Sequence, residues 1–321
     1  MDIEFHYYIT YIVALRAGYH PNDAYLIAYS CQYTDDNNEQ FEISNGTPDQ
    51  YRNYISQTES ILKPPNELLR IHPIFHFVPG TKDEIFVDSG RRRDGKLHLL
   101  NTIPKNQNAG LLLKEALGSK NLYRIGIASH AYSDTFAHQN FVGCKDSFNA
   151  MAGVIEKVIP YIGHAEAEYK PDWPAAFWKD ERLIQSHSNI NNKQRFLDAA
   201  ISLFKEYCNS SGRSPSSQEV ENLNKELDKA IGEEDDSNRL TEDRIGRYKA
   251  LIGDHFMEYD SEAWFKEVAD KKMGFFKWIY TWKENYKKSN WFQFQESVKA
   301  HQRLTIERLS PAYEMMEIPN F

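Results

Sequence analysis

Apolar residues recur at intervals of three or four along most of the chain, a spacing typical of amphipathic helices. In the first half this pattern predicts helices over about residues 3–17, 21–36, 108–117, 122–140 and 146–169. In the second half it predicts helices over about residues 175–188, 192–208, 217–231, 241–258 and 261–300. Residues 37–65 are polar and rich in turn-forming pairs, so we expect a long excursion there with at most short helices.

The helix expected over residues 122–140 carries a polar stripe. His130, Asp134 and His138 follow one another at intervals of four, which places their side chains on one face. At about 1.5 Å per residue the two histidines stand roughly 12 Å apart, too far to bind one ion through bonds of about 2.0–2.1 Å. The stripe therefore indicates two metal ions, one bound by His130 and one by His138, with Asp134 as a bridging carboxylate. The alternative is a buried helix whose histidines bond to carbonyl groups or water.

Further candidate ligands lie at the ends of the first two helices. His6 is in the first turn of the first helix, and Asp35 and Asp36 end the second. Two carboxylates at a helix C-terminus oppose the helix dipole, so their placement is easier to understand if a cation binds there. A solvated turn is the other interpretation.

Histidines at two later places extend the candidate set. His76 follows His72, and the proline after His72 favours an extended conformation, so we take His76 as the ligand and His72 as structural. His164 and Glu168 are four residues apart near the end of the helix expected over residues 146–169. We prefer Glu168 to Glu166 because Glu166 would point away from His164 on an unbroken helix.

Composition limits the chemistry. The chain has 321 residues, 41% of them hydrophobic, and a formal net charge of −8, so its overall charge does not favour nucleic acid or acidic lipid. Only Cys31, Cys144 and Cys208 are cysteines, and no CxxC pair occurs, which argues against a disulfide framework and thiolate zinc sites. Any metal must therefore be bound by histidine and carboxylate.

The sequence also bears on location. Asp2 and Glu4 precede the first apolar residues and no basic stretch does, so we expect no secretory signal. No run of about 18 apolar residues occurs, so we expect no transmembrane segment and a cytoplasmic protein. Residues 271–294 are aromatic and basic together, and they either lie on a membrane interface or cover the core.

The candidate ligands occur in an order that resembles a known group of metalloenzymes. FHYYITYIVA, YSCQYTDD, FHFVPG, SHAYSDTFAHQ and GHAEAE are similar to parts of the zinc-dependent phospholipase C family and of its relatives, the single-strand-specific zinc nucleases. The similarity covers residues 1–175 and looks closest to a bacterial branch. It implies an all-α fold, a single large helical domain in which residues 1–175 form the metal-binding core and residues 176–321 a helical extension packed on it.

The resemblance also implies a site. Zinc, as two or three ions, would be bound by His6, Asp35, His76, His130, Asp134, His138, His164 and Glu168. Asp35 or Asp36 would lie close to the attacking water as the catalytic base. Family members ligate one zinc through the mature amino-terminal residue, whereas this chain starts at Met1 without a leader, so Asp2 would take that place. The spacing from Asp134 to His138 is shorter than in the best-known phospholipases.

The expected function is that of a phospholipase C-like phosphodiester hydrolase that uses a zinc-activated water. Manganese and iron also suit these ligands. The alternative substrate is single-stranded nucleic acid, and the alternative to an enzyme is a non-catalytic helical binding protein. Because an intracellular hydrolase of this kind would endanger its host, we also expect a regulatory partner, delivery to another cell, or a narrow range of substrates.

Overall fold

The computed structural model describes residues 1–44, 50–58, 63–151, 162–274 and 278–318. A π-helical turn over Glu4–Ile9 leads into the first helices, which are α1 (Thr10–Ala17), α2 (Pro21–Asp36), α3 (Pro65–Leu69), α4 (His72–Phe75), α5 (Lys82–Asp88), α6 (Gln107–Ser119) and α7 (Leu122–Ala137). The later helices are α8 (Asn192–Ser210), α9 (Ser217–Ile231), α10 (Thr241–Ile252), α11 (Ala263–Val268) and α12 (Asn290–Met315). The strands are β1 (Glu42–Ser44), β2 (Gln50–Arg52), β3 (Phe177–Lys179), β4 (Asn189–Asn191), β5 (Ala269–Met273) and β6 (Trp278–Trp282).

The expectation of an all-α fold is wrong, because strands in the described part of the chain form two sheets and make the fold α+β. The larger sheet has the order β2-β1-β6-β5, in which β1 and β6 are parallel and the two outer pairs are antiparallel. β3 and β4 form a separate antiparallel pair. Each strand is only three to five residues long, too short for an alternating pattern to stand out from helical spacing.

One helix expected in the second half is absent, and another is interrupted by strands. Residues 175–188 contain β3 and turns, and β4 follows directly. Residues 261–300 divide into α11, the antiparallel strands β5 and β6, and the start of α12. The sequence of β6, WIYTW, consists of residues with high β propensity, which here decide the local structure. The excursion over residues 37–65 likewise contains β1 and β2 in addition to the start of α3.

The helix expected over residues 146–169 does not continue to its predicted end. Residues 152–161, in the middle of the expected helix, lie outside the described residues. Beyond them, Gly163 has a φ of 52° and Ala165–Ala167 form a single 3₁₀ turn. A Cβ at position 163 would lie 2.5 Å from the Phe77 ring, so both the backbone angle and the close approach require glycine. His164 and Glu168 therefore do not share the face of a regular helix.

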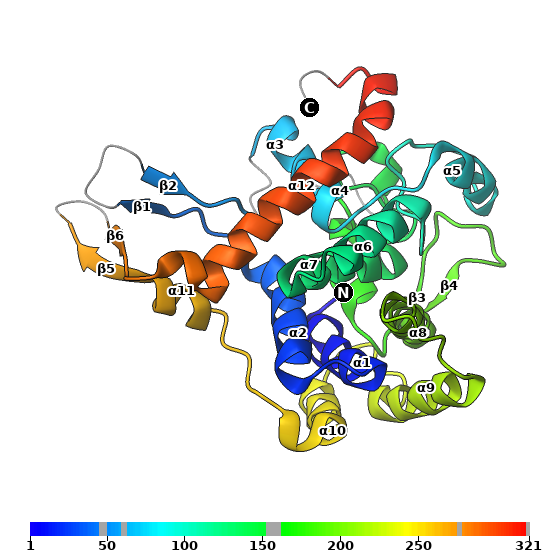
Figure 1. The fold of residues 1–321 in the computed structure, drawn as a ribbon. Helices are drawn as coiled ribbons and strands as arrows, with labels where there is room; N and C mark the ends of the chain where they lie inside the picture. Colours follow the sequence, from blue (N-terminus) through cyan, green and yellow to red (C-terminus); the bar gives the residue numbers. More distant parts are fainter. Residues whose placement is uncertain (45–49, 59–62, 152–161, 275–277, 319–321) are drawn as a thin grey trace.

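Helix α7 lies at the centre of the molecule (Figure 1). It packs against α2, α6, α8 and α12, and every residue from Ile125 to Ala137 is buried. Gly126 allows the closest approach to α2, because a Cβ there would lie 2.5 Å from the backbone oxygen of Ile27. The polar stripe of α7 is therefore placed inside the protein, facing the end of α2.

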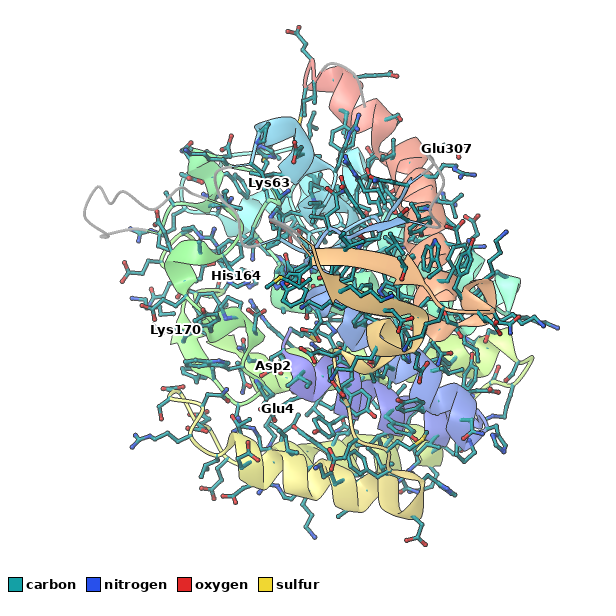
Figure 2. All side chains as sticks on the ribbon, turned by 90° about the vertical axis from the view of Figure 1, so that its left-hand side faces the viewer. Asp2, Glu4, Lys63, His164, Lys170 and Glu307 are labelled. Atoms are coloured by element: carbon teal, nitrogen blue, oxygen red, sulfur yellow. The ribbon has the colours of Figure 1, made fainter. Side chains whose placement is uncertain are left out.

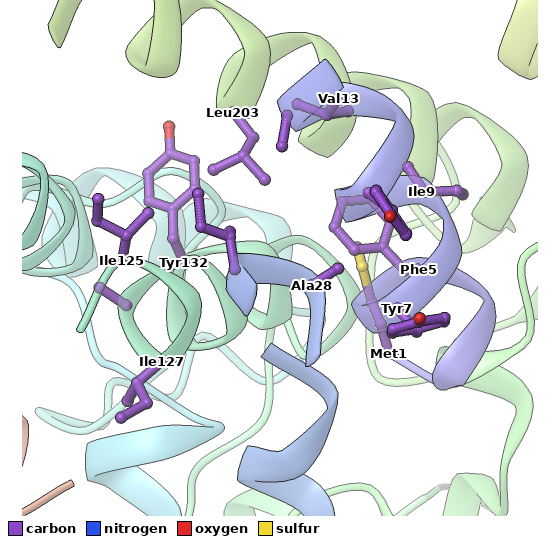
Figure 3. Packing of buried hydrophobic residues seen from close by; sticks show 14 of the residues in the cluster. Met1, Phe5, Tyr7, Ile9, Val13, Ala28, Ile125, Ile127, Tyr132 and Leu203 are labelled. Carbon is purple, nitrogen blue, oxygen red and sulfur yellow. The ribbon is translucent and has the colours of Figure 1, made fainter. Parts of the chain in front are cut away.

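One hydrophobic core joins the two halves of the sequence. The largest cluster contains Phe5, Tyr132 and Leu203, which Figure 3 shows, and it extends to Trp291. The division of the chain at residue 175 stays a prediction. No helix in the described part of the chain combines the length and apolarity needed to cross a membrane.

Candidate metal centre

Four predicted ligands converge at the ends of α2 and α4 and in the middle of α7. The Asp134 Oδ2 lies 3.3 Å from His76 Nδ1 and 3.3 Å from His130 Nε2, and Asp35 Oδ1 lies 3.6 Å from each nitrogen. The two nitrogens are 3.0 Å apart. Ligand atoms on one tetrahedral ion stand about 3.3–3.4 Å apart when their bonds are about 2.0–2.1 Å long. One ligand atom from each of Asp35, His76 and His130 lies within 4.8 Å of the others, which fits a shared ion, and Asp134 lies next to both histidines. Asp35, His76, His130 and Asp134 are called the first set below.

The histidines of the first set are oriented by backbone carbonyl groups. His130 Nδ1 donates to the Cys31 oxygen at 2.9 Å, and His76 Nε2 donates to the Ser56 oxygen at 2.9 Å. Burial lowers the pKa of His130, but Asp35 and Asp134 outweigh burial and hold that pKa well above its usual value. The protonated ring can therefore donate from Nε2 to His76 Nδ1, and a shared cation would take the place of this proton. This carbonyl support of the opposite ring nitrogen is the usual outer shell of metal-binding histidines.

A second set consists of His138, His164 and Asp172. His138 Nε2 lies 3.0 Å from Asp172 Oδ1, and His164 Nε2 lies 3.2 Å from Asp172 Oδ2. The other ring nitrogens again donate to carbonyl oxygens, those of His76 and Glu168, each at 2.8 Å. The second set thus repeats the chemistry of the first.

A third set contains the Met1 amino group, His6 and the other oxygen of Asp134. Asp134 Oδ1 lies 2.5 Å from the amino nitrogen and 3.2 Å from His6 Nε2. His6 Nε2 is buried and has no hydrogen-bond partner among the described residues. The amino nitrogen also lies 3.1 Å from Asp172 Oδ1, so this group joins the second and third sets.

Charge in the site is balanced through these contacts. Burial lowers the pKa of the Met1 amine, but Asp134, Asp172 and Asp35 outweigh burial and raise that pKa to about 11. Burial raises the pKa of Asp134, and the amine together with His138 and His130 reverses the effect and holds the pKa well below its usual value. Burial also raises the pKa of Asp35. The carboxylates therefore gain stability from positive charge nearby, which a bound cation would supply.

Members of all three sets line one cleft of about 270 Å³, although His6 and His130 do not reach it. His72 also lines this cleft and is 9% exposed, although we took it as structural. Its expected extended conformation is wrong, because His72 begins α4 and the proline after it occupies the first turn, where no N–H is needed. Burial lowers the pKa of His72 to about 3, so its ring is neutral at pH 7.

Of the predicted residues, the structure brings together His6, Asp35, His76, His130, Asp134, His138 and His164. Asp36 lies outside this group, and its carboxylate accepts hydrogen bonds from Tyr259 and Gln32. Glu168 is exposed at a φ of 58° and contributes only its backbone oxygen, to the His164 ring. Asp2 and Glu4 are labelled in Figure 2, and Asp2 accepts a hydrogen bond from the Glu4 backbone. The Met1 amine, and not Asp2, contacts Asp134.

The arrangement of Asp134 differs from the expectation in one respect. The Asp134 Oδ2 faces His76 and His130 of the first set, and its Oδ1 faces His6 of the third set. We expected Asp134 to lie between His130 and His138 instead. His138 Nδ1 lies 3.7 Å from Asp134 Oδ2, but this nitrogen is bonded to the His76 carbonyl, so the ring offers its Nε2 to Asp172 instead.

Sequence reasoning missed Asp172 and Cys31. Asp172 follows His164 by eight residues, and Gly163 was the available signal that the chain turns there instead of continuing as a helix. Cys31 contacts two of the candidate ligands, because its oxygen accepts from His130 and its sulfur lies 3.6 Å from His6 Nδ1. Burial raises the pKa of the Cys31 thiol, and His6, Cys31 and His130 together form a group that could bind a metal.

The chain matches a known protein family. Residues 1–309 match the model of a family described as a family of unknown function, DUF6765. The chain belongs to the DUF6765 family. The matched region includes all three sets and continues almost to the end of α12. No curated protein and no solved structure matches the chain.

Proposed function

We propose that this member of the DUF6765 family is a metal-dependent phosphodiester hydrolase. The observation that carries the proposal is the position of Asp134, whose two oxygens face two different histidine-containing sets. A carboxylate shared in this way is the usual bridge between neighbouring ions in two-metal hydrolases. Histidine nitrogen and carboxylate oxygen suit zinc, and also manganese and iron.

The three sets indicate which residues would bind each metal ion. Asp35, His76, His130 and Asp134 would bind the first ion, and His138, His164 and Asp172 the second. His6 and the other oxygen of Asp134 would contribute to a third. The ions would stabilise negative charge on a phosphoryl group and lower the pKa of water towards neutrality.

Side chains that line the cleft would orient the water, move its proton and bind the substrate. Asp35 borders the cleft with a partly exposed carboxylate, so it is placed to orient an attacking water and accept its proton. His72 borders the same cleft, and a neutral imidazole there can donate one hydrogen bond to a phosphoryl or leaving oxygen. Buried His138 and Phe77, whose rings stack 4.4 Å apart, form an apolar side that limits water access.

Activity assays with a matched pair of variants test this proposal. The zinc-loaded protein is tested on bis(p-nitrophenyl) phosphate, phosphatidylcholine and single-stranded DNA. Asp134→Ala should lower the rate on any accepted substrate more than about 100-fold, because even supporting residues of a metal site cost 10–100-fold. Asp36→Asn, which changes a carboxylate outside the cleft, should retain the wild-type rate within about threefold. No hydrolysis of any of the three substrates by the metal-loaded wild type would count against the proposal.

A further inference from the structure

The hairpin of β5 and β6 ends in exposed apolar side chains. Met273 is 74% exposed, and Trp278 and Ile279 are each 46% exposed. Met273 is paired with Trp278, and Ile279 is paired with Lys272 one position further in. Successive side chains of a strand point to opposite faces, so both faces of the hairpin carry apolar groups near its end.

The other end of the same hairpin is firmly packed. Tyr280 contacts Phe41 with ring centroids 5.3 Å apart, and Trp282 contacts Tyr51 at 5.2 Å. The body of the protein therefore covers the aromatic residues nearest to it and leaves the outer ones in solvent. Figure 1 shows β5 and β6 projecting from the helical body, and β5 is one of the two edge strands of its sheet.

The charge around the hairpin is opposite to that of the whole chain. Residues 271–288 contain six lysines and one glutamate, whereas the protein has a net charge of −8. Lys271 and Lys272 are exposed on β5, and the Lys271 ammonium lies 4.2 Å from the centre of the Trp278 ring. Exposed tryptophan and aliphatic side chains flanked by lysines match the boundary of a bilayer, where rings lie among headgroups and ammonium groups meet lipid phosphates.

We propose that the outer end of the β5–β6 hairpin, formed by Lys271, Lys272, Met273, Trp278 and Ile279, docks on an anionic lipid surface. The apolar side chains enter the headgroup region, and the lysines pair with phosphates. This surface contains none of the residues of the metal centre, so docking requires neither a bound metal nor hydrolysis.

The sheet also connects the docking surface to the cleft. β1 pairs with β6, and the chain segments on either side of the β1–β2 pair return to the metal centre. Asp35 lies before β1, and Gln57 lies after β2, and both line the cleft. Ser56, next to Gln57, accepts the hydrogen bond that orients His76.

Vesicle co-sedimentation with the full-length, chelator-treated protein tests the proposal. Vesicles of phosphatidylcholine containing about 30% phosphatidylglycerol are compared with pure phosphatidylcholine, at low and high salt. Wild type should bind the anionic vesicles at least tenfold more strongly, and salt should weaken binding. The Met273→Ser, Trp278→Ser, Ile279→Ser triple variant should lose at least tenfold in affinity, and Lys271→Gln with Lys272→Gln should lose the preference for anionic lipid.

A matched control comes from another exposed apolar pair. Phe86 and Val87 on α5 are 70% and 82% exposed, so Phe86→Ser with Val87→Ser removes apolar surface elsewhere and should leave vesicle binding unchanged. The circular dichroism and unfolding midpoint of each variant establish that it is folded. The proposal is overturned if the wild-type protein does not bind anionic vesicles. It is also overturned if the triple variant is folded and binds these vesicles with the wild-type affinity. Sedimentation velocity that shows the hairpin joining two copies of the chain also overturns it.

Because metal is absent from this assay, its outcome does not depend on the proposed hydrolase activity. Hydrolysis of water-soluble bis(p-nitrophenyl) phosphate by the metal-loaded triple variant should match the wild-type rate. Loss of lipid binding with retained hydrolysis would therefore locate docking and catalysis in different parts of the chain.

Discussion

Replacing Gly126 with alanine should destabilise the protein, although alanine is the better helix former. Gly126 lies where α7 crosses α2. A Cβ at this position would lie 2.5 Å from the Ile27 oxygen, 2.5 Å from Ser30 Cβ and 2.9 Å from the Cys31 nitrogen. Two of these atoms belong to the backbone of α2, so the contact cannot be relieved by rotating a side chain.

The net effect follows from two opposing contributions. Optimal contacts between such atoms are about 3.5–4.0 Å long, so the helices must separate by about 1 Å. Extra volume in a packed core costs about 1–3 kcal/mol, and the upper part of this range applies because backbone atoms resist the shift. Alanine returns up to about 1 kcal/mol of helix propensity. We therefore expect Gly126→Ala to lower the free energy of unfolding by about 2 kcal/mol.

The separation of the helices should also reach the metal centre. Cys31 and Asp35 lie on α2, whereas His130 and Asp134 lie on α7, so the same shift lengthens the distances within the first set. The measurement is urea unfolding followed by circular dichroism, with and without zinc. The difference between wild type and variant should be larger with zinc, because the variant also binds the metal more weakly.

Gly110→Ala is the matched control. Gly110 lies in α6, and a Cβ there meets no atom within 4 Å, so the same substitution should stabilise the protein by about 0.5–1 kcal/mol. If Gly126→Ala raises the free energy of unfolding as Gly110→Ala does, the packing described for α2 and α7 is wrong.

Two further predictions concern buried charge. Burial lowers the pKa of His301 to about 4, whereas its pKa in the unfolded chain is near 6.5. Between these two values the unfolded chain binds a proton that the folded chain does not bind. The free energy of unfolding therefore falls as pH drops from about 6.5 to 4. His301→Gln should reduce this acid-dependent loss by about 2 kcal/mol in urea unfolding at pH 7 and 4.5, and equal losses in both proteins would contradict it. Arg244 pairs with Glu4 at 2.8 and 2.9 Å and with Asp235 at 3.0 Å, all buried, so Arg244→Met should cost about 3–5 kcal/mol. The Glu4→Gln, Arg244→Met double variant should recover part of this loss in the same assay, and no recovery would show that the penalty is not an unpaired charge.

The parts of the fold that could be predicted from sequence are those with a long regular pattern. α2, α7, α8 and α9 match their predicted ranges closely, because each has at least four turns of helical spacing. The strands could not be predicted, since three to five residues carry too little periodic signal, and their pairing partners are distant in sequence: β1 pairs with β6 across more than 200 residues.

The same distinction applies to the site. His130 and Asp134 could be placed because the helical face fixes their relative positions. Glu168 was chosen on the assumption of a continuing helix, and the positive φ at Gly163 and Glu168 breaks that assumption and brings Asp172 to His164 instead. The carbonyl groups that orient the rings, and the placement of the Met1 amine beside Asp134, arise from tertiary packing, which local spacing does not encode.

The metal content of the purified protein tests whether these side chains converge on shared cations. Protein prepared without chelator is analysed by inductively coupled plasma mass spectrometry, together with Asp172→Asn and Glu168→Gln. Wild type and Glu168→Gln should both contain about two to three equivalents of zinc or a related metal, and Asp172→Asn should contain about one equivalent fewer. Absence of metal from the wild type, even after zinc is supplied, would contradict the account, as would a loss in Glu168→Gln that Asp172→Asn does not share.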